Sequence, residues 1–266
     1  MHSTPGESFI EMRDISKIYS TPKGSIEALS AVDIDVKERE FVSIVGPSGC
    51  GKSTLMMIVS GLTRPTSGTV TITGTRVTKP YTDLGIVFQR DVLLDWRTVF
   101  ENVMLPCEIR KLPRPAAEDR IHELLESVGL SEFRAQHPYE LSGGMRQRVA
   151  ICRALVHDPP LLLMDEPFGA LDALTRDQLN IDLQHLWSQS QKTVLFITHS
   201  IAEAVFLADR IIVMSAHPGV VRESIKIDLP RPRHLGVRES APFGEYVRRV
   251  HEIFFKFGVL TEREQH

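Results

Sequence analysis

Long apolar runs, excess charge and a cysteine framework are all missing from this chain of 266 residues. No apolar run approaches the roughly 20 residues that cross a bilayer, and the polar start gives no reason to expect a secretory signal. Three scattered cysteines exclude a disulfide framework or a cysteine metal site, and they favour a reducing cytosol. We interpret two of them, Cys107 and Cys152, as small buried apolar residues. The net charge of -3 argues against broad nucleic-acid contact.

The composition, 42% apolar and 24% charged, is that of a globular protein. Alternating or short apolar runs predict strands at residues 9–19, 28–36, 41–45, 69–73, 84–88, 161–164, 193–198 and 210–214. Helix signals, including capping boxes at Thr98 with Glu101 and at Ser200 with Glu203, predict helices at residues 52–59, from 98 onward, 115–128, 142–157, 175–189, 200–207 and 242–257.

This order predicts an α/β fold. We expect a mostly parallel sheet with helices on both faces, an N-terminal antiparallel β region and an inserted helical sub-domain. The expected core comprises residues 1–89 and 158–230, the helical sub-domain residues 90–157, and a C-terminal extension with a closing helix residues 231–266.

A glycine-rich segment lies between the strand at 41–45 and the helix at 52–59. Residues 46–53, Gly-Pro-Ser-Gly-Cys-Gly-Lys-Ser, match the phosphate-loop pattern in its required strand-to-helix context. Glycines let successive N–H groups turn inward around an anion, and the helix N-terminus adds partial positive charge. We expect Lys52 to reach the β- and γ-phosphates of a nucleotide and Ser53 to bind Mg²⁺. The alternative is a chance glycine-rich turn.

Two carboxylates follow the apolar strand at 161–164. We expect Asp165, at the carboxyl end of the strand, to hold Mg²⁺ directly or through water. Because side chains alternate along a strand, Glu166 should point elsewhere and could polarise a water for attack on the γ-phosphorus. An ordinary acidic turn is the alternative.

Residues 141–145, Leu-Ser-Gly-Gly-Met, resemble the signature motif of ABC-transporter ATPases, whose usual form is LSGGQ. The resemblance covers nearly the whole chain. Ser142, Gly143 and Gly144 at a helix N-terminus form a second anion site. In the family this surface closes on the γ-phosphate held by the other ATPase subunit, so the resemblance implies a homodimer. Met145 departs from the usual Gln, while Arg146 to Arg148 read as a plain helix start.

The resemblance implies roles for further residues. Tyr19 matches the aromatic that stacks on adenine, with a core tyrosine as the alternative, and Gln89 matches the glutamine that senses Mg²⁺ and the attacking water. His199 matches the histidine that contacts the γ-phosphate, and Asp172 lies in the loop that links the two sites or is a helix N-cap. The implied nucleotide contacts are Tyr19, Gly46, Pro47, Ser48, Gly49, Cys50, Gly51, Lys52, Ser53, Thr54, Ser142, Gly143 and Gly144. The implied catalytic set is Glu166, His199 and Gln89, and the implied Mg²⁺ ligands are Ser53, Gln89 and Asp165.

Within the family, residues 164–176 and the Leu-Pro-Arg-Pro-Arg segment at 229–233 are most similar to nitrate, sulfonate and taurine importers. The resemblance implies an ATPase with ATP and Mg²⁺ that works peripherally on the cytoplasmic face of the inner membrane. Its partners would be transmembrane permease subunits and an extracytoplasmic solute-binding protein, and no nucleic acid. The apolar residues Val92, Leu93, Leu94 and Trp96 fit a groove for a permease helix or the core of the sub-domain.

Three rival functions stay open at this point: the ATPase of an ABC exporter, a non-transport ABC protein, and a soluble P-loop kinase. The kinase does not explain residues 141–144. Non-transport members generally carry two fused ATPase halves or long coiled-coil insertions, and this sequence shows neither.

Overall fold

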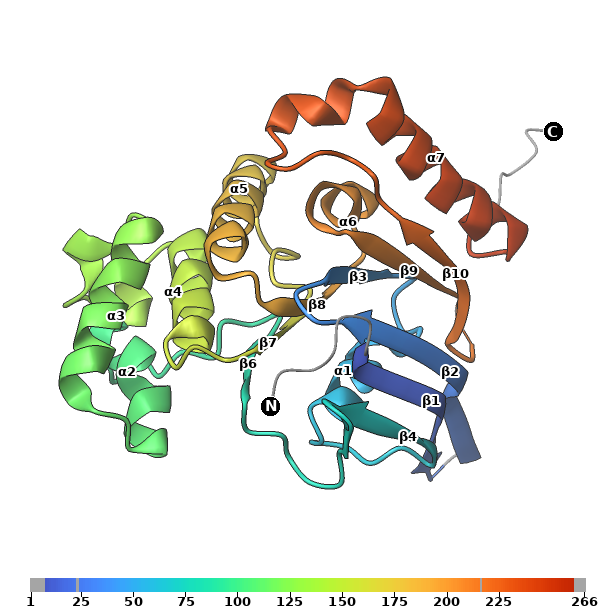
Figure 1. Ribbon diagram of the computed structural model, residues 1–266, viewed down its shortest axis with the longest axis horizontal. Coiled ribbons are helices and arrows are strands. Elements are labelled where there is room, and N and C mark those ends of the chain that lie inside the picture. Colours follow the sequence, from blue (N-terminus) through green and yellow to red (C-terminus); the bar gives the residue numbers. More distant parts are fainter. Residues whose placement is uncertain (1–7, 23, 216, 261–266) are drawn as a thin grey trace. The chain divides into compact units, whose positions relative to one another are not determined.

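A computed structural model describes residues 8–22, 24–215 and 217–260. The chain forms two compact units. One runs up to Thr82 and resumes at Thr193, and the other is Asp83–Lys192. Figure 1 colours the elements along the chain. The first unit contains β1 (Ser8–Thr21), β2 (Gly24–Lys37), β3 (Phe41–Val45), α1 (Lys52–Val59), β4 (Ser67–Ile72), β5 (Thr75–Arg76), β8 (Thr193–Thr198), α6 (Ile201–Leu207), β9 (Arg210–Ser215), β10 (Val220–Lys226) and α7 (Ala241–Lys256).

An antiparallel sheet occupies the start of the first unit, in the strand order β2-β1-β4-β5. It confirms the predicted N-terminal antiparallel region. β1 and β2 have 14 residues each and pair out to Thr21 and Gly24, beyond the predicted ends. Apolar residues of β1, such as Ile10, Met12 and Ile15, are fully buried, whereas the hairpin tip is exposed and carries no alternating pattern. Backbone pairing therefore extends the strands past the apolar signal.

Parallel strands form the centre of the first unit, where β3 pairs with β8 on one side and β9 on the other. Every residue of β3 and β8 is buried, which accounts for their nearly continuous apolar sequences. β10 pairs antiparallel with β9 and was not predicted, because its residues do not alternate clearly between apolar and polar. Together with the parallel pair of the second unit, these strands confirm the predicted α/β class.

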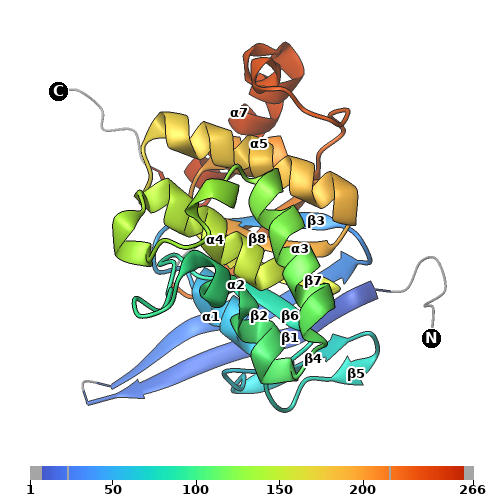
Figure 2. The ribbon, with the colours of Figure 1, turned by 90° about the vertical axis from the view of Figure 1, so that its left-hand side faces the viewer.

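The second unit contains one parallel strand pair and most of the helices. Figure 2 shows α2, α3 and α4 lying together in green. The elements are β6 (Leu84–Val87), α2 (Val99–Arg110), α3 (Arg114–Ser127), α4 (Gly143–Leu155), β7 (Leu161–Asp165) and α5 (Ala173–Ser190). The capping box that predicted α2 is present: the Glu101 amide donates to Thr98 Oγ1 at 3.3 Å, and the Thr98 amide donates to Glu101 Oε2 at 2.8 Å.

The second predicted capping box, at the start of α6, forms only in half. The Glu203 amide donates to Ser200 Oγ at 3.3 Å, as expected. The Glu203 carboxylate does not return to the Ser200 amide. It accepts a hydrogen bond from Thr198 Oγ1 at 2.6 Å instead, and the Ser200 amide donates to Thr198 Oγ1 at 3.0 Å. A buried hydroxyl on the preceding strand therefore competes successfully for the carboxylate.

The three cysteines are free and buried. Burial raises the pKa of Cys152 to about 12 and also raises the pKa of Cys107. Both stay protonated at neutral pH, which confirms their interpretation as small buried residues. The closing helix is confirmed as α7. It buries Phe243, Val250 and Ile253 along one face and packs against α6.

Candidate functional site

The loop between β3 and α1 has the geometry of an anion-binding turn. Gly49 and Gly51 have φ angles of 78° and 90°, in the left-handed region that favours glycine. A Cβ on Gly51 would lie 2.7 Å from the Ala28 carbonyl oxygen, and one on Gly46 would lie 2.9 Å from the Met214 carbonyl oxygen. The neighbouring backbone thus leaves no room for side chains at these positions, and it fixes the path of the loop.

Lys52 opens α1 and is 4% exposed. Its Nζ donates to the carbonyl oxygens of Gly46 at 2.9 Å and Pro47 at 3.1 Å, so the ammonium lies within the loop. No side chain caps the N-terminus of α1, and its first turn has no acidic residue. The helix dipole and the lysine therefore act together on an anion. Ser53 follows on the same turn and is exposed.

His199 lies beside the start of this loop. In the parallel register of β3 and β8, Val45 pairs with Thr198, so Gly46 and His199 leave neighbouring strands at the same edge of the sheet. His199 is exposed at that edge. The predicted phosphate loop and the predicted histidine thus come together within the first unit, although 144 residues separate Thr54 from His199 in the sequence.

Tyr19 is 39% exposed, so its interpretation as a core residue is wrong. It lies near the end of β1, with its hydroxyl 3.5 Å from Thr54 Oγ1, in the turn of α1 that follows the loop. Lys17 Nζ is 4.9 Å from the centre of the Tyr19 ring. An exposed ring next to a residue of α1 suits a planar ligand such as adenine.

The second unit brings together the two carboxylates and Gln89. In the parallel register of β6 and β7, Val87 pairs with Met164, so Gln89 and Glu166 both follow the same sheet edge by two residues. Asp165 is the last residue of β7, as predicted. Glu166 lies beyond the strand with a φ of 43°, so strand alternation does not set the direction of its side chain. The turn that begins at Glu166 sets the direction of this side chain instead.

The signature residues form the start of α4. Ser142 is the N-cap, and its Oγ accepts a hydrogen bond from the Met145 amide at 3.3 Å. Gly144 is buried, and a Cβ there would lie 2.5 Å from Thr175 Cγ2 of α5. This glycine therefore has a packing role besides its predicted role toward phosphate.

Asp172 caps α5, with Oδ1 accepting from the Thr175 amide at 3.0 Å and Oδ2 accepting from Thr175 Oγ1 at 2.6 Å. Hydrogen bonds from the Thr175 hydroxyl and amide lower the pKa of Asp172. The helix N-cap interpretation is confirmed.

Sequence reasoning missed the residues that hold the segment after Gln89. Arg146 Nε donates to Asp91 Oδ2 at 2.9 Å, and Arg153 donates to the carbonyl oxygens of Val92 at 2.8 Å and Asp91 at 2.7 Å. The two arginines lie seven residues apart on α4, which places them on one face. That spacing was the available signal, but the sequence could not say what the face contacts.

The apolar segment after Asp91 is exposed at two of its four apolar residues, while Leu93 and Leu94 are half-buried. Val92 is 54% exposed and Trp96 is 75% exposed, so neither belongs to the sub-domain core. Asn102 is fully buried below the segment. Its Nδ2 donates to the carbonyl oxygens of Leu94 and Arg97, and its Oδ1 accepts from the Leu94 amide at 2.8 Å. A fixed loop thus presents an aromatic side chain outward, as a partner-binding surface does.

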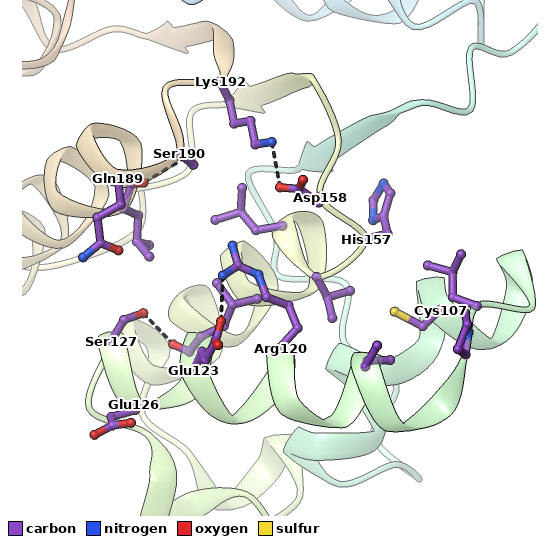
Figure 3. Close-up of a pocket in the computed structure, with 18 of the residues that line it drawn as sticks. Cys107, Arg120, Glu123, Glu126, Ser127, His157, Asp158, Gln189, Ser190 and Lys192 are labelled. Atoms are coloured by element: carbon purple, nitrogen blue, oxygen red, sulfur yellow. Dashed lines mark hydrogen bonds and ion pairs between the residues drawn. The ribbon is translucent and has the colours of Figure 1, made fainter.

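A cavity of about 1030 Å³ lies elsewhere in the second unit, between α3 and the end of α5. Figure 3 shows two ion pairs among its side chains, Lys192 with Asp158 at 2.7 Å and Arg120 with Glu123 at 3.0 Å. Of the residues predicted to bind nucleotide or Mg²⁺, none lines it. We assign no part of the nucleotide chemistry to this cavity.

The residues fit a nucleotide with Mg²⁺. The glycine positions that exclude a Cβ, the buried Lys52 and the first turn of α1 suit a phosphate chain. Hydroxyl and carboxylate oxygens such as those of Ser53 and Asp165 are the donors that Mg²⁺ prefers, with phosphates and water completing its shell.

Comparisons with known proteins agree with this geometry. A family model described as ABC transporter matches residues 29–169. The aliphatic sulfonates import ATP-binding protein of Bacillus cereus is 40% identical over 251 residues, which cover 94% of this chain and 98% of that protein. The bicarbonate transport ATP-binding protein of Synechococcus elongatus is 44% identical over 235 residues, covering 87% and 84%. A dimeric post-hydrolysis state of an ATP-binding cassette, bound to ADP and phosphate, has a TM-score of 0.73 at 34% identity and covers 83% of this chain and 100% of that one.

Proposed function

This chain belongs to the ABC transporter family of ATP-binding proteins, and from that premise we propose that it is the ATP-hydrolysing subunit of an importer. The solute that we propose is a small anionic or organosulfur nutrient of the nitrate, sulfonate or taurine kind. Two of its relatives are named for the import of aliphatic sulfonates and the transport of bicarbonate. The single observation that supports the ATPase role best is the Ser142 N-cap of α4 in a chain that also has a complete phosphate loop.

The nucleotide roles divide between the two units. In the first, residues 46–54 hold the phosphates, Tyr19 stacks on adenine and His199 contacts the γ-phosphate. In the second, Glu166 orients and activates the attacking water, and Gln89 senses that water. Ser53, Asp165 and Gln89 would hold Mg²⁺, which would supply positive charge to stabilise the transferring phosphate.

We further propose that two copies of the chain form a homodimer around ATP. Ser142, Gly143 and Gly144 of one copy then bind the γ-phosphate that Lys52 of the other copy holds. The similar cassette bound to ADP and phosphate is dimeric, which supports this arrangement. A second helix N-terminus adds positive potential where the nucleotide carries most negative charge.

The exposed segment with Val92 and Trp96 is the proposed contact with the permease. Among the described residues, no helix is long and apolar enough to cross a bilayer. The transmembrane path then comes from separate permease subunits, and a solute-binding protein on the other side of the membrane delivers the solute. The subunit itself works peripherally, on the cytoplasmic face of the inner membrane.

For function we divide the chain into an ATPase core of residues 1–89 and 158–230, a helical sub-domain of residues 90–157 and a C-terminal extension of residues 231–266. The core binds and hydrolyses ATP, and the sub-domain carries the signature residues and the permease contact. The division places Gln89 at the junction of core and sub-domain.

Reconstitution tests the importer proposal. The chain is co-expressed with candidate permeases of sulfonate, taurine and nitrate importers, and each purified complex is placed in proteoliposomes with the matching binding protein. We expect ATP-dependent uptake of a sulfonate, taurine or nitrate, with no uptake by the Lys52→Ala complex. Hydrolysis without association with any permease would contradict the transport role. ATP-driven movement away from the side of the binding protein would instead identify an exporter.

A further inference from the structure

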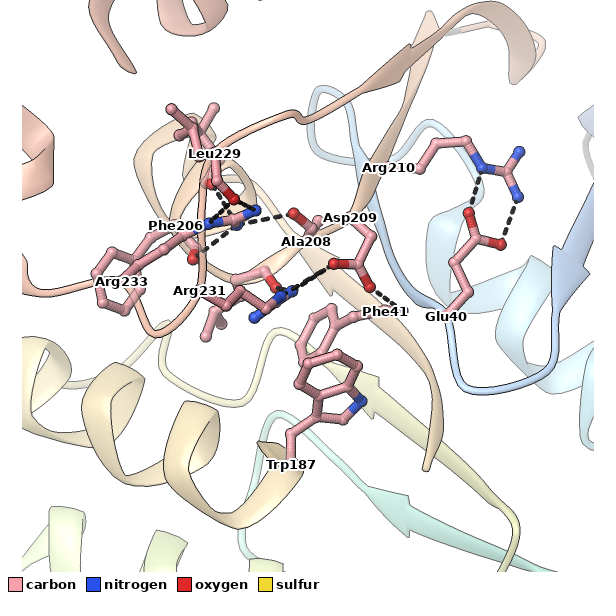
Figure 4. A network of polar contacts seen from close by, with 12 residues as sticks. Glu40, Phe41, Trp187, Phe206, Ala208, Asp209, Arg210, Leu229, Arg231 and Arg233 are labelled. Carbon is pink, nitrogen blue, oxygen red and sulfur yellow. Dashed lines mark hydrogen bonds and ion pairs between the residues drawn. The ribbon is translucent and has the colours of Figure 1, made fainter. Parts of the chain in front are cut away.

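The C-terminal extension places a buried arginine at the end of α6. Arg233 is 3% exposed, and its Nη1 lies within hydrogen-bond distance of the carbonyl oxygens of Val205 at 3.0 Å, Phe206 at 3.0 Å and Ala208 at 2.8 Å. Its Nη2 donates to the Leu229 carbonyl oxygen at 3.1 Å. Figure 4 shows the guanidinium pointing into this group of carbonyls.

These contacts satisfy backbone groups that a helix leaves unpaired. The last four carbonyls of an α-helix have no partner within the helix, and a cation near that end is favoured by the helix dipole. Burial lowers the pKa of Arg233 to about 10, with the nearby Arg231 charge as a smaller cause. The guanidinium therefore stays charged at neutral pH.

A second arginine strengthens the same end. Arg231 Nη2 donates to the Leu207 carbonyl oxygen and, at 2.9 Å, to Asp209 Oδ1. Asp209 Oδ2 accepts a hydrogen bond from the Phe41 amide at 2.9 Å, at the start of β3. The carboxyl end of α6 is thus joined through side chains to the strand that leads into the phosphate loop.

The N-terminal end of α6 is hydrogen-bonded to the residues on either side of His199. Thr198, directly before it, donates to the buried carboxylate of Glu203, while Ser200, directly after it, caps the Glu203 amide and donates its own amide to Thr198 Oγ1. Glu203 lies on α6. A movement of this helix therefore moves both residues that flank His199.

α6 has only 7 residues. Isolated helices shorter than about 12–15 residues are marginal in water, so the position of α6 depends on what holds its ends and its buried face. From this arrangement we propose that Arg233 is a positioning residue for His199: it fixes the carboxyl end of α6, and α6 transmits that position to the residues on either side of the histidine. The proposal rests on the proposed contact of His199 with the γ-phosphate, and it gives the C-terminal extension a part in ATP hydrolysis.

The test variants are Arg233→Met, which keeps length and loses every donor, and Arg233→Lys, which keeps charge and loses the planar fork. Arg249→Ala is the matched control. This arginine lies in the same extension, on α7, with its side chain 54% exposed, and it pairs with Glu223 on the surface. Steady-state and single-turnover hydrolysis are measured for each variant, with circular dichroism to verify folding.

We expect Arg233→Met to lower kcat roughly 10- to 100-fold, the range in which small displacements of reacting groups act. KM for ATP should change less than about twofold, because residues 46–54, which hold the phosphates, stay in place and His199 supplies only one contact to the γ-phosphate. Arg233→Lys should fall between Met and the parent protein, and Arg249→Ala should equal the parent. A folded Arg233→Met protein with normal kcat would overturn the proposal.

Amide hydrogen exchange measures directly whether the loss of Arg233 at one end of α6 loosens the His199 end. The measurement does not depend on ATP hydrolysis. In Arg233→Met we expect faster amide exchange in residues 198–203, at the His199 end, as well as in residues 204–209 beside the lost guanidinium. Faster exchange confined to residues 204–209 would mean that the arginine stabilises only its own end of the helix, and the positioning role would be wrong. Arg233→Lys gives the same readout if Arg233→Met does not fold.

A double-mutant cycle separates this proposal from the proposed function. If Arg233 acts through His199, Arg233→Met should cause little further loss of single-turnover rate in the His199→Ala background. Equal losses in both backgrounds would reject Arg233 as a positioning residue and leave the role of His199 intact. Normal turnover of His199→Ala itself would reject the role of His199, and the positioning proposal with it.

Discussion

The sequence marks the N-termini of both α1 and α4 as anion sites, yet the two helix N-termini are built differently. α1 has no side-chain cap, left-handed glycines before it and the buried Lys52 in its first turn. α4 has its Met145 amide occupied by Ser142 Oγ, and the arginine of its first turn, Arg146, is paired with Asp91. The first end can therefore hold a phosphate by itself. The second is suited to adding hydrogen bonds to a phosphate that is already held elsewhere.

The largest expected effect concerns Glu166, the carboxylate proposed to activate water after α1 of one copy and α4 of the other have bound the same nucleotide. Glu166→Gln should lower the hydrolysis rate by about 10²- to 10⁴-fold, because a positioned base is lost, while ATP binding remains. A closed dimer should then accumulate with ATP, visible by size-exclusion chromatography. Glu118→Gln, an exposed change on α3, is the control and should leave turnover unchanged. Near-normal turnover of Glu166→Gln would remove this carboxylate from the mechanism.

Tethered dimers test whether the two unequal ends share one ATP. The lesions are Lys52→Ala, which removes the cation, and Ser142→Asp, which sets a carboxylate against the γ-phosphate. Aspartate is also a good N-cap, so α4 keeps its start. A change at Gly144 would be less clean, because any side chain there would meet Thr175.

With one lesion on each subunit, both fall in the same shared site and the other site stays intact. With both lesions on one subunit, each shared site carries one defect. The first arrangement should retain more ATP-dependent closure, measured by fluorescence energy transfer between the subunits. Equal closure in the two arrangements would contradict a shared nucleotide.

Tyr19 sharpens the contrast further, since its exposed ring lies next to Thr54 of α1. Tyr19→Ala should weaken ATP binding by about 1–3 kcal/mol, the range for base stacking on aromatic side chains. Tyr19→Phe keeps the flat ring and should bind ATP almost normally. Calorimetry on both variants checks this. Lower thermal stability of Tyr19→Ala with unchanged affinity would assign the ring a structural role instead.

The smallest expected effect concerns the cap itself. Ser142→Ala should lower the free energy of unfolding by about 1 kcal/mol without nucleotide, whereas Ser142→Asp should stay close to the parent. Urea denaturation of both variants provides the measurement. Equal losses in the two would mean that the hydroxyl does not cap α4 in solution.

Local signals predicted much of this molecule. The strand–glycine–lysine–helix order predicted the loop at 46–53, and the Thr98 capping box predicted the start of α2, because both depend on residues that are near in sequence. The parallel strands β3 and β8 were predicted because burial on both faces requires continuous apolar runs.

The missed features depend on pairing between distant residues. β10 follows from hydrogen bonding to β9 rather than from its own pattern, and Asp91 finds Arg146 and Arg153 across more than 50 residues of sequence. Glu166 turned out to lie beyond its strand. Pro167 and Gly169 mark the turn that follows, but they do not predict the φ of 43° at Glu166 itself. No local rule specifies such contacts, because side-chain partners are chosen by the assembled fold.

The hydrogen bonds of Lys52 have a consequence for the speed of the cycle. Its ammonium donates to the Gly46 and Pro47 carbonyl oxygens. The lysine therefore gives up these two hydrogen bonds when it binds a phosphate. Part of the favourable energy between the ammonium and the phosphate therefore only offsets the loss of these two hydrogen bonds. A departing product leaves the same two carbonyls to receive the ammonium again, which lowers the barrier to its exit. An ATPase must release its products in every catalytic cycle, so a phosphate affinity of moderate strength favours fast turnover.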